Sequence, residues 1–141
     1  MIFDSSSIFN LIKDNKIEIL FDGKTSGLVY FELCNLLWKE SYIFKKIELE
    51  EAIMILSLML EILAEMKIQE VDLKEVLELS VKLGITSYDA VFVHLALKEN
   101  ETLVTDDEKL KRRVREVVRV KSSEEINTKD AESQLNSTNF L

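Results

Sequence analysis

The 141-residue chain has no proline, one cysteine, one histidine and only three glycines, and these scarcities exclude several kinds of protein. Because Cys34 is the sole cysteine, an internal disulfide and a thiolate metal site are both excluded, which fits a reducing cytosol. The glycines do not form a phosphate-binding loop, so nucleoside triphosphate chemistry is not expected.

Long apolar runs are also missing. The longest, residues 52–60, is interrupted only by Ser57 and closed by Glu61, whereas a membrane-spanning helix needs about 20 apolar residues. The first residues have neither the basic segment nor the cleavage site of a signal peptide. A hydrophobic content of 47% and a charged content of 31% are typical of soluble globular proteins. These features predict a cytoplasmic protein with no membrane segment.

Positive charge is scarce overall but concentrated in one segment. The net charge of −8 argues against general binding of nucleic acid, since phosphate neutralisation needs clustered lysine and arginine. Between residues 109 and 121, however, Glu116 is the only acid among many basic residues. This segment is either a solvated helix face or a local contact for phosphate groups.

The hydrophobic pattern predicts short strands that alternate with helices. Strands are expected at residues 1–3, 25–28, 84–86, 102–104 and 117–120. Helices are expected after a cap at Ser5 or Ser6, at residues 29–40, 49–66 and 72–82, after a cap at Ser87, and as a short basic segment after Asp107. Residues 16–21 fit either helix or strand, and 49–66 fit either the core or a dimer face.

This alternation of strands and helices predicts a parallel sheet that is covered by helices on both faces. The length of the chain favours a single domain, which we expect to extend over residues 1–126. Residues 127–141 are mostly polar and poor in core residues, so we expect them to form a loosely ordered tail.

Several acids follow the expected strands or begin the expected helices. Asp4 follows the first strand, Asp107 lies three residues past Val104, and Asp89 lies in the first turn of its helix. The carboxyl ends of parallel strands share one edge of a sheet, and Glu32 near a helix start can join the acids there. Carboxylates crowded in this way repel one another unless a hard cation such as Mg²⁺ or Mn²⁺ binds them. A carboxylate-held metal suits phosphodiester hydrolysis by activated water.

His94 and Cys34 are not expected to belong to this acidic site. His94 follows Asp89 by five positions, about 140° around a helix, so we interpret it as a core or surface residue. Cys34 lies two positions after Glu32, on another face of its helix, and we interpret it as a packing residue.

Four segments, in this order and at this spacing, resemble the PIN-domain family, and in particular the VapC-type toxins of toxin–antitoxin pairs. They are residues 1–6 (MIFDSS), 31–35 (FELCN), 86–90 (TSYDA) with Leu95 and Ala96, and 103–110 (LVTDDEKL). The resemblance implies a three-layer α/β PIN-like fold with a short parallel sheet. It also implies an endoribonuclease that hydrolyses RNA with Mg²⁺ or Mn²⁺ as its cofactor.

The same resemblance implies roles for individual residues. The metal-binding and catalytic positions would be Asp4, Glu32, Asp89 and Asp107. The supporting positions would be Ser6, Asn35, Thr105 and Asp106, the last as an assistant to, or substitute for, the acid that follows it. The basic residues expected to hold RNA phosphates are Lys109, Lys111, Arg112, Arg113 and Arg115.

The resemblance further implies partners. A homodimer is expected, together with an antitoxin whose tail enters the acidic groove, often with an arginine.

Two alternative functions remain open: a non-catalytic regulatory or binding protein with the same fold, and a structure-specific DNA nuclease. The second would need additional helical regions that grip DNA, for which 141 residues leave little room.

Overall fold

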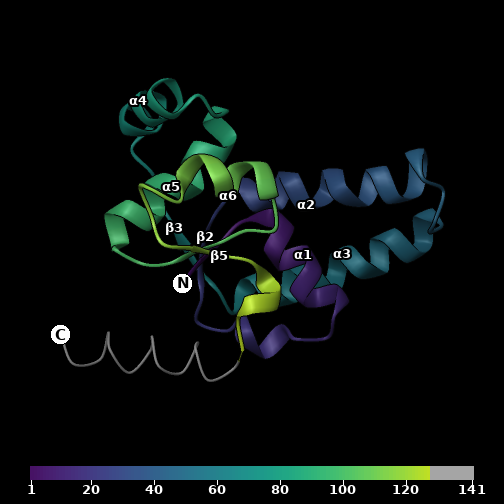
Figure 1. The fold of residues 1–141 in the computed structure, drawn as a ribbon. Coiled ribbons are helices and arrows are strands. Elements are labelled where there is room, and N and C mark those ends of the chain that lie inside the picture. Colours follow the sequence, from purple (N-terminus) through teal and green to yellow (C-terminus); the bar gives the residue numbers. More distant parts are fainter. Residues whose placement is uncertain (128–141) are drawn as a thin grey trace.

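The structure of the protein is a computed structural model, and its described part, residues 1–127, is built around a five-stranded parallel sheet (Figure 1). The strands are β1 (Ile2–Phe3), β2 (Lys24–Ser26), β3 (Lys67–Gln69), β4 (Leu103–Val104) and β5 (Val120–Lys121). Their order across the sheet is β3-β2-β1-β4-β5. The chain therefore builds outward from β1 to β3 and then returns to the other side of β1. The order reverses between β1 and β4, which is where open α/β sheets bind ligands.

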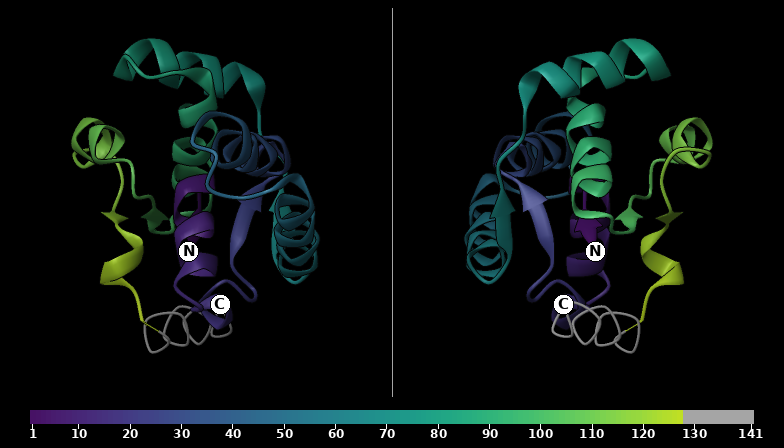
Figure 2. Two further views of the ribbon diagram at one scale, coloured as in Figure 1. Left: turned by 90° about the vertical axis from the view of Figure 1, so that its right-hand side faces the viewer. Right: turned by 90° about the vertical axis from the view of Figure 1, so that its left-hand side faces the viewer.

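Helices connect the strands and cover both faces of the sheet. They are α1 (Ser5–Lys13), η1 (Ile17–Ile19), α2 (Leu28–Trp38), η2 (Lys39–Ile43), α3 (Leu49–Ala64), α4 (Leu73–Leu83), α5 (Ser87–Glu99), α6 (Glu108–Val114) and η3 (Ser123–Glu125). The two views of Figure 2 place α1 and α5 on opposite sides of the sheet. The predicted three-layer α/β fold with a short parallel sheet is confirmed.

The central helix of the core is α5. Its residues 90–96 are all buried, and the helix packs against β1 and β2. Strand β4, the other neighbour of β1, is also buried. The core clusters these residues with apolar side chains of α1, α2 and α3. Because the middle of the molecule is apolar, the carboxylates are confined to the ends of the strands.

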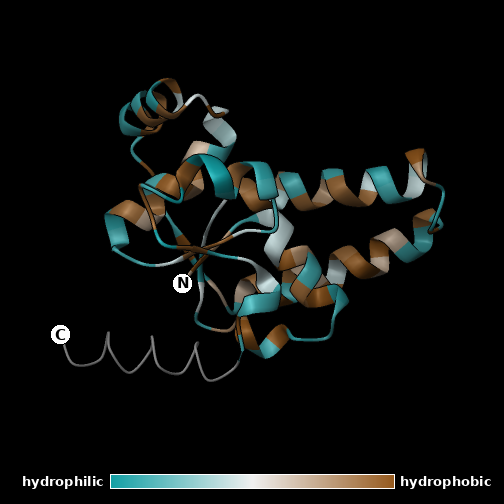
Figure 3. Cartoon of the chain, in the orientation of Figure 1, coloured by the Kyte–Doolittle hydropathy of each residue, from teal (hydrophilic) through white to brown (hydrophobic). Residues whose placement is uncertain are grey.

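Helices α2 and α3 form a long arm that projects away from the sheet, with the π-helical turn η2 at its tip (Figure 1). Hydrophobic residues lie along the whole arm (Figure 3), and many of them are exposed. The expectation that residues 49–66 belong to the core holds for one side of α3, which buries Ala52, Met59, Ile62 and Leu63. Among residues 1–127, no helix has both the length and the apolar character that a membrane crossing requires.

Two helix caps differ from the prediction by one residue. Asp4, rather than Ser5 or Ser6, caps α1 by accepting a hydrogen bond from the Ser7 backbone N–H. Thr86, rather than Ser87, caps α5. The Asp72 cap and the Gly84 end of α4 are as expected.

The strand boundaries differ more than the helix boundaries. Residues 84–86 do not form a strand, because Gly84 ends α4 in the left-handed conformation and the Ile85 N–H bonds back to Ser80. Strand β5 begins later than expected because the N–H groups of Val117 and Val118 still bond to the carbonyl of Val114. Strand β3, a mostly exposed edge strand without an apolar pattern, was not predicted from the sequence. Apart from Asn127, the expected tail lies outside the described residues.

Candidate active site

Asp4 is the first residue after β1 and lies almost fully buried at the point where the strand order reverses. Its Oδ1 accepts hydrogen bonds from the Ser6 hydroxyl (2.8 Å) and the Ser7 backbone N–H (2.9 Å). The Thr105 hydroxyl donates to Oδ2 of the same carboxylate. Burial raises the pKa of Asp4, and these donors oppose the rise. The surrounding hydroxyls therefore fix the direction of the carboxylate.

Asp89 and Asp107 line one small cavity of about 120 Å³. The backbone N–H of Asp89 donates to Thr86 Oγ1 (3.1 Å) at the start of α5. Burial and the charge of Asp107 raise the pKa of Asp89. Asp107 caps α6 by accepting from the Leu110 N–H (3.0 Å), and its own N–H donates to Thr105 Oγ1 (3.2 Å). Thr105 therefore links Asp4 to Asp107.

Glu32 extends from α2 toward the same acids. Its Oε1 is buried and has no hydrogen-bond partner among the described residues. Burial, followed by the negative charges of Asp4 and Asp89, raises the pKa of Glu32 to about 7, although a hydrogen bond from Ser5 opposes the shift. An oxygen buried without a donor beside other carboxylates lies in a place suited to a cation.

The four expected acids thus lie within electrostatic range of one another: Glu32 with Asp4 and Asp89, and Asp89 with Asp107. They are not drawn together, however. Within residues 1–127, no three acidic, histidine or cysteine side chains are arranged as a ready-made metal site. Carboxylates within this range repel one another, and a cation bound among them would offset that repulsion. The raised pKa values and the orphan oxygen of Glu32 mean that the residues fit a divalent cation.

The supporting residues expected from sequence divide into two groups. Ser6 and Thr105 lie at the site, where both donate to Asp4, and Ser6 Oγ also accepts from the Asp106 N–H (3.0 Å). Asn35 is exposed on α2.

The structure places the Asp106 side chain elsewhere. Its carboxylate accepts from Asn10 Nδ2 (2.7 Å), from the Ser123 N–H (2.7 Å) and from the Ser123 hydroxyl (2.6 Å). These bonds hold α1 and η3 against the loop after β4. The structure therefore does not bring Asp106 together with the four acids, whereas its neighbour Asp107 lies among them.

The expected RNA-binding residues occupy different sides of α6. Lys109 and Arg113 line the cavity that holds Asp89 and Asp107. Lys111 points away and pairs with Glu125 (3.1 Å) and Glu108 (3.8 Å). The other two arginines, Arg112 and Arg115, are exposed outside the cavity.

His94 lies away from the acids, as predicted. It is buried between α4 and α5, where Nε2 accepts from the Asp72 N–H (3.2 Å) and Nδ1 lies 3.3 Å from Glu75 Oε2. This pattern corresponds to an imidazole that carries its proton on Nδ1. Its role in the described structure is to hold the start of α4.

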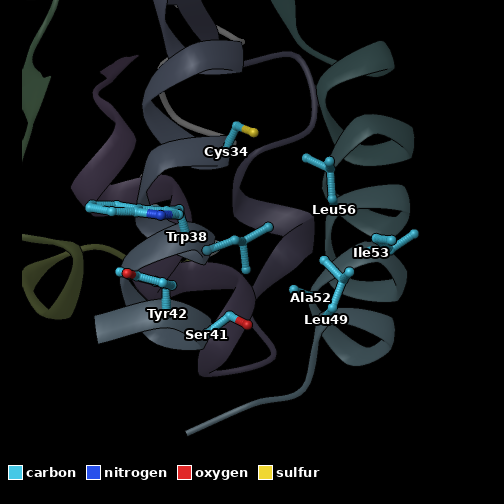
Figure 4. Close-up of a pocket in the computed structure, with 9 residues that line it drawn as sticks. Cys34, Trp38, Ser41, Tyr42, Leu49, Ala52, Ile53 and Leu56 are labelled. Carbon is cyan, nitrogen blue, oxygen red and sulfur yellow. The ribbon is translucent and has the colours of Figure 1, made fainter. Parts of the chain in front are cut away.

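The prediction that Cys34 is a packing residue is wrong for this chain, because the residue is exposed. It borders an apolar groove of about 450 Å³ between the two helices of the arm (Figure 4). Trp38 and Tyr42, whose rings stack 5.7 Å apart, form one wall of this groove, and Leu49 and Ile53 lie on the opposite helix. The described chain leaves this groove uncovered.

Sequence reasoning missed two residues that act on the acids. Ser5 donates to the Glu32 carboxylate, and Thr86 accepts from the Asp89 backbone N–H. The signal for Thr86 was present as a second hydroxyl beside the expected cap. Nothing local connects Ser5 with Glu32, since they lie on different helices.

The model of the PIN domain family matches residues 1–116. The match covers most of the chain, and the protein therefore belongs to the PIN domain family. Among solved structures, PAE2754 from Pyrobaculum aerophilum is 23% identical, with a TM-score of 0.74 over 87% of this chain and 88% of that one. VapBC-1 from nontypeable Haemophilus influenzae is 19% identical, with a TM-score of 0.53 over 88% of this chain and 99% of the other. These likenesses show a shared fold. No curated protein matches the chain.

Proposed function

We propose that this PIN-domain protein is a metal-dependent endoribonuclease that hydrolyses phosphodiester bonds of RNA. The observation that carries the proposal is the group of four carboxylates at the reversal of strand order. Burial and the charges of Asp4 and Asp89 raise the pKa of Glu32, burial and the charge of Asp107 raise that of Asp89, and Glu32 Oε1 has no donor among the described residues. A nuclease site must bind a cation beside a phosphate, and a set of uncompensated carboxylates suits that task.

In this proposal Asp4, Glu32, Asp89 and Asp107 hold Mg²⁺ or Mn²⁺, which supplies Lewis acidity toward water and toward a phosphate oxygen. Thr105, Ser6 and Ser7 keep the Asp4 carboxylate in one orientation. Without the cation, burial and the neighbouring acids raise the pKa of Glu32 to about 7. A bound cation would favour the ionised carboxylate, which would then bind the ion or orient water. Asn35, one turn after Glu32, is proposed as a supporting residue facing the approaching RNA.

The biological form of the proposal is the toxin of a toxin–antitoxin pair. Two observations support it: the family match, and the shared fold with VapBC-1. The antitoxin would place an arginine of its tail among the acids, since its positive charge can neutralise the same carboxylates that would bind the metal. The apolar groove of the arm, with Trp38 and Ile53 on its two sides, would bind an apolar helix of that antitoxin.

A cleavage assay tests the proposal. Purified protein, freed of any co-purifying partner, is incubated with a mixed RNA pool and either Mn²⁺, Mg²⁺ or EDTA. We expect cleavage with metal, none with EDTA, and a loss of about 100-fold or more for Asp89→Asn. The matched control is Asp14→Asn, which removes the same charge from an exposed position outside the cluster. Equal cleavage by Asp89→Asn and Asp14→Asn would overturn the assignment.

The same assay separates the two rivals. Parallel reactions with single-stranded and duplex DNA detect a DNA nuclease, which would cut DNA in preference to RNA. A non-catalytic protein would cut neither and would show no heat of binding when titrated with Mn²⁺. A neighbouring open reading frame for a small DNA-binding protein would favour the toxin, and its absence would weaken that part of the proposal.

A further inference from the structure

The cavity beside Asp89 and Asp107 contains positive as well as negative side chains. It lies between the turn that joins α4 to α5 and one side of α6. Two carboxylates, Asp89 and Asp107, and two cations, Lys109 and Arg113, line it together. Its volume of about 120 Å³ makes it a small pocket that can hold a group of a few atoms, such as one phosphate.

Helix α6 presents these two cations side by side. Lys109 and Arg113 are four residues apart, so their side chains lie on the same flank of the helix. Leu110 and Val114 on the adjacent face are buried, which fixes how the helix is rotated against the core. Within residues 1–127, neither cation of the cavity forms an ion pair within 4 Å, whereas Lys111 on the other flank pairs with Glu125.

Gly84 lies beside Arg113 at the wall of the cavity. It adopts the left-handed conformation (φ +65°) at the end of α4. A Cβ atom at this position would lie 3.4 Å from Arg113 Nη1, at van der Waals distance. The end of α4 therefore lies directly against the guanidinium group.

We infer that Lys109 and Arg113 form a binding subsite for one phosphate group of the RNA backbone, next to the phosphodiester that is cut. This inference rests on the proposed nuclease function and names the residues that make the site accept an anion. RNA carries one negative charge per phosphate, and the four acids would repel it. The planar guanidinium of Arg113 can bind two phosphate oxygens at once, and Lys109 adds a second, compact charge.

The subsite also positions the strand. A phosphate held by α6 at this cavity lies beside Asp89 and Asp107, so the neighbouring phosphodiester reaches the acids without a further contact to the bases. The contact reads the backbone rather than the sequence. Selection among RNA sequences must therefore come from other parts of the surface.

Binding of a short fluorescent single-stranded RNA in EDTA tests the inference without cleavage. We expect Arg113→Ala to weaken binding about 5- to 10-fold, and to lower the slope of log affinity against log salt by about one. Arg119→Ala is the matched control, because it removes the same charge from an exposed position outside the cavity. We expect it to weaken binding by about twofold or less. Arg113→Lys should recover part of the loss, since lysine restores the charge but lacks the planar guanidinium group that binds two phosphate oxygens.

A cleavage measurement then separates this inference from the nuclease proposal. If the protein binds RNA through Arg113 but cuts none, the subsite stands and the nuclease fails. If it cuts RNA while Arg113→Ala and the double variant Lys109→Ala/Arg113→Ala bind like Arg119→Ala, the nuclease stands and the subsite is overturned. Absence of RNA binding by the unaltered protein overturns the subsite as well. Thermal unfolding of each variant confirms that the comparison is made between folded proteins.

Discussion

The hydroxyl of Thr105 donates a hydrogen bond to Oδ2 of Asp4, joining two residues that are 101 positions apart in the chain. Each residue directly follows a strand, β1 or β4, and these strands are neighbours in the sheet. The bond therefore connects the register of the sheet to the direction of a buried carboxylate. It also explains why a threonine, rather than an apolar residue, is fully buried at this position.

Thr105→Val should destabilise the protein, because it keeps the shape of the side chain and removes the donor to a buried carboxylate. We expect the free energy of unfolding to fall by about 1–3 kcal/mol. Thr105→Ser, which retains the hydroxyl, should recover most of this loss. Denaturant unfolding at pH 7 measures both variants, and equal stability of the valine and serine variants would show that the hydrogen bond contributes nothing.

Glu32 should make the metal-free protein less stable as the pH rises. The pKa of Glu32 is about 7 in the folded protein, whereas the ordinary value for a glutamate, which applies to the unfolded chain, is 4.5. The folded state therefore favours the protonated form. The stabilisation is complete below about pH 4.5 and disappears as the pH rises through 7. Because Glu32 is only half-buried, we expect solvent to limit the loss to about 1–2 kcal/mol.

Glu32→Gln should abolish this part of the pH dependence. In EDTA the variant should gain stability over the parent chain at pH 8 and not at pH 4. Glu61→Gln, an exposed change on α3, provides the control for removal of a negative charge. At pH 8, addition of Mn²⁺ should raise the melting temperature of the parent chain more than that of Glu32→Gln, and an equal rise would exclude Glu32 from the cation site.

Gly84 should be intolerant of a side chain, in contrast with Gly27. Gly84→Ala forces alanine into a left-handed conformation (φ +65°), which should cost about 1–2 kcal/mol of stability. Gly27 has ordinary helical angles, and no atom lies within 4 Å of a Cβ built there. Gly27→Ala should therefore be neutral or slightly stabilising. Thermal unfolding of the two variants tests the contrast, and similar melting temperatures would contradict it.

Helix α4 offers a surface for the homodimer that the family resemblance implies. Leu73, Leu77 and Val81 form an exposed apolar stripe, and beside it Lys74 and Glu78 alternate in charge. Two antiparallel copies of such a helix can bury the stripe and place opposite charges face to face. We expect the protein to be a dimer that Leu77→Glu dissociates.

Met54→Glu on α3 is the matched control for this experiment, because Met54 (73% exposed) and Leu77 (59% exposed) are both accessible apolar residues. Analytical ultracentrifugation measures the mass of each variant. Dissociation by Met54→Glu instead of Leu77→Glu would assign the dimer to α3, the dimer face that the sequence suggested. A monomeric parent chain would contradict the dimer altogether.

The sequence predicted the parts of this protein that depend on local patterns. Asp4 and Asp89 were correctly predicted to lie at the ends of helices or strands, because caps and apolar runs can be recognised from neighbouring residues in the sequence. The choice between adjacent equivalent residues was not predictable in the same way. Thr86 and Ser87 are both hydroxyl residues that can cap a helix. In the structure the Ser87 hydroxyl donates to Ser80 Oγ (3.2 Å), and Thr86 accepts from the Asp89 N–H as the cap.

Other features depend on distant residues. Whether Asp106 or Asp107 faces the acids is decided by Asn10 and Ser123, which bind the first of the two. In the same way, Glu125 removes Lys111 from the set of available cations on α6. A periodic pattern in the sequence cannot predict such contacts, since they form only when the strands have been brought together.

The central position of β1 has a consequence for synthesis of the protein. The first strand to leave the ribosome has to wait for β4, a hundred residues later, before its second edge is paired. Until that moment Asp4 lacks the Thr105 donor, and Asp107 is not yet attached to the growing sheet. A chain that ends before β4 therefore contains Asp4, Glu32 and Asp89 but lacks Asp107. For the proposed ribonuclease this means that the site is complete only after residues 103–107 have been made and β4 has joined the sheet.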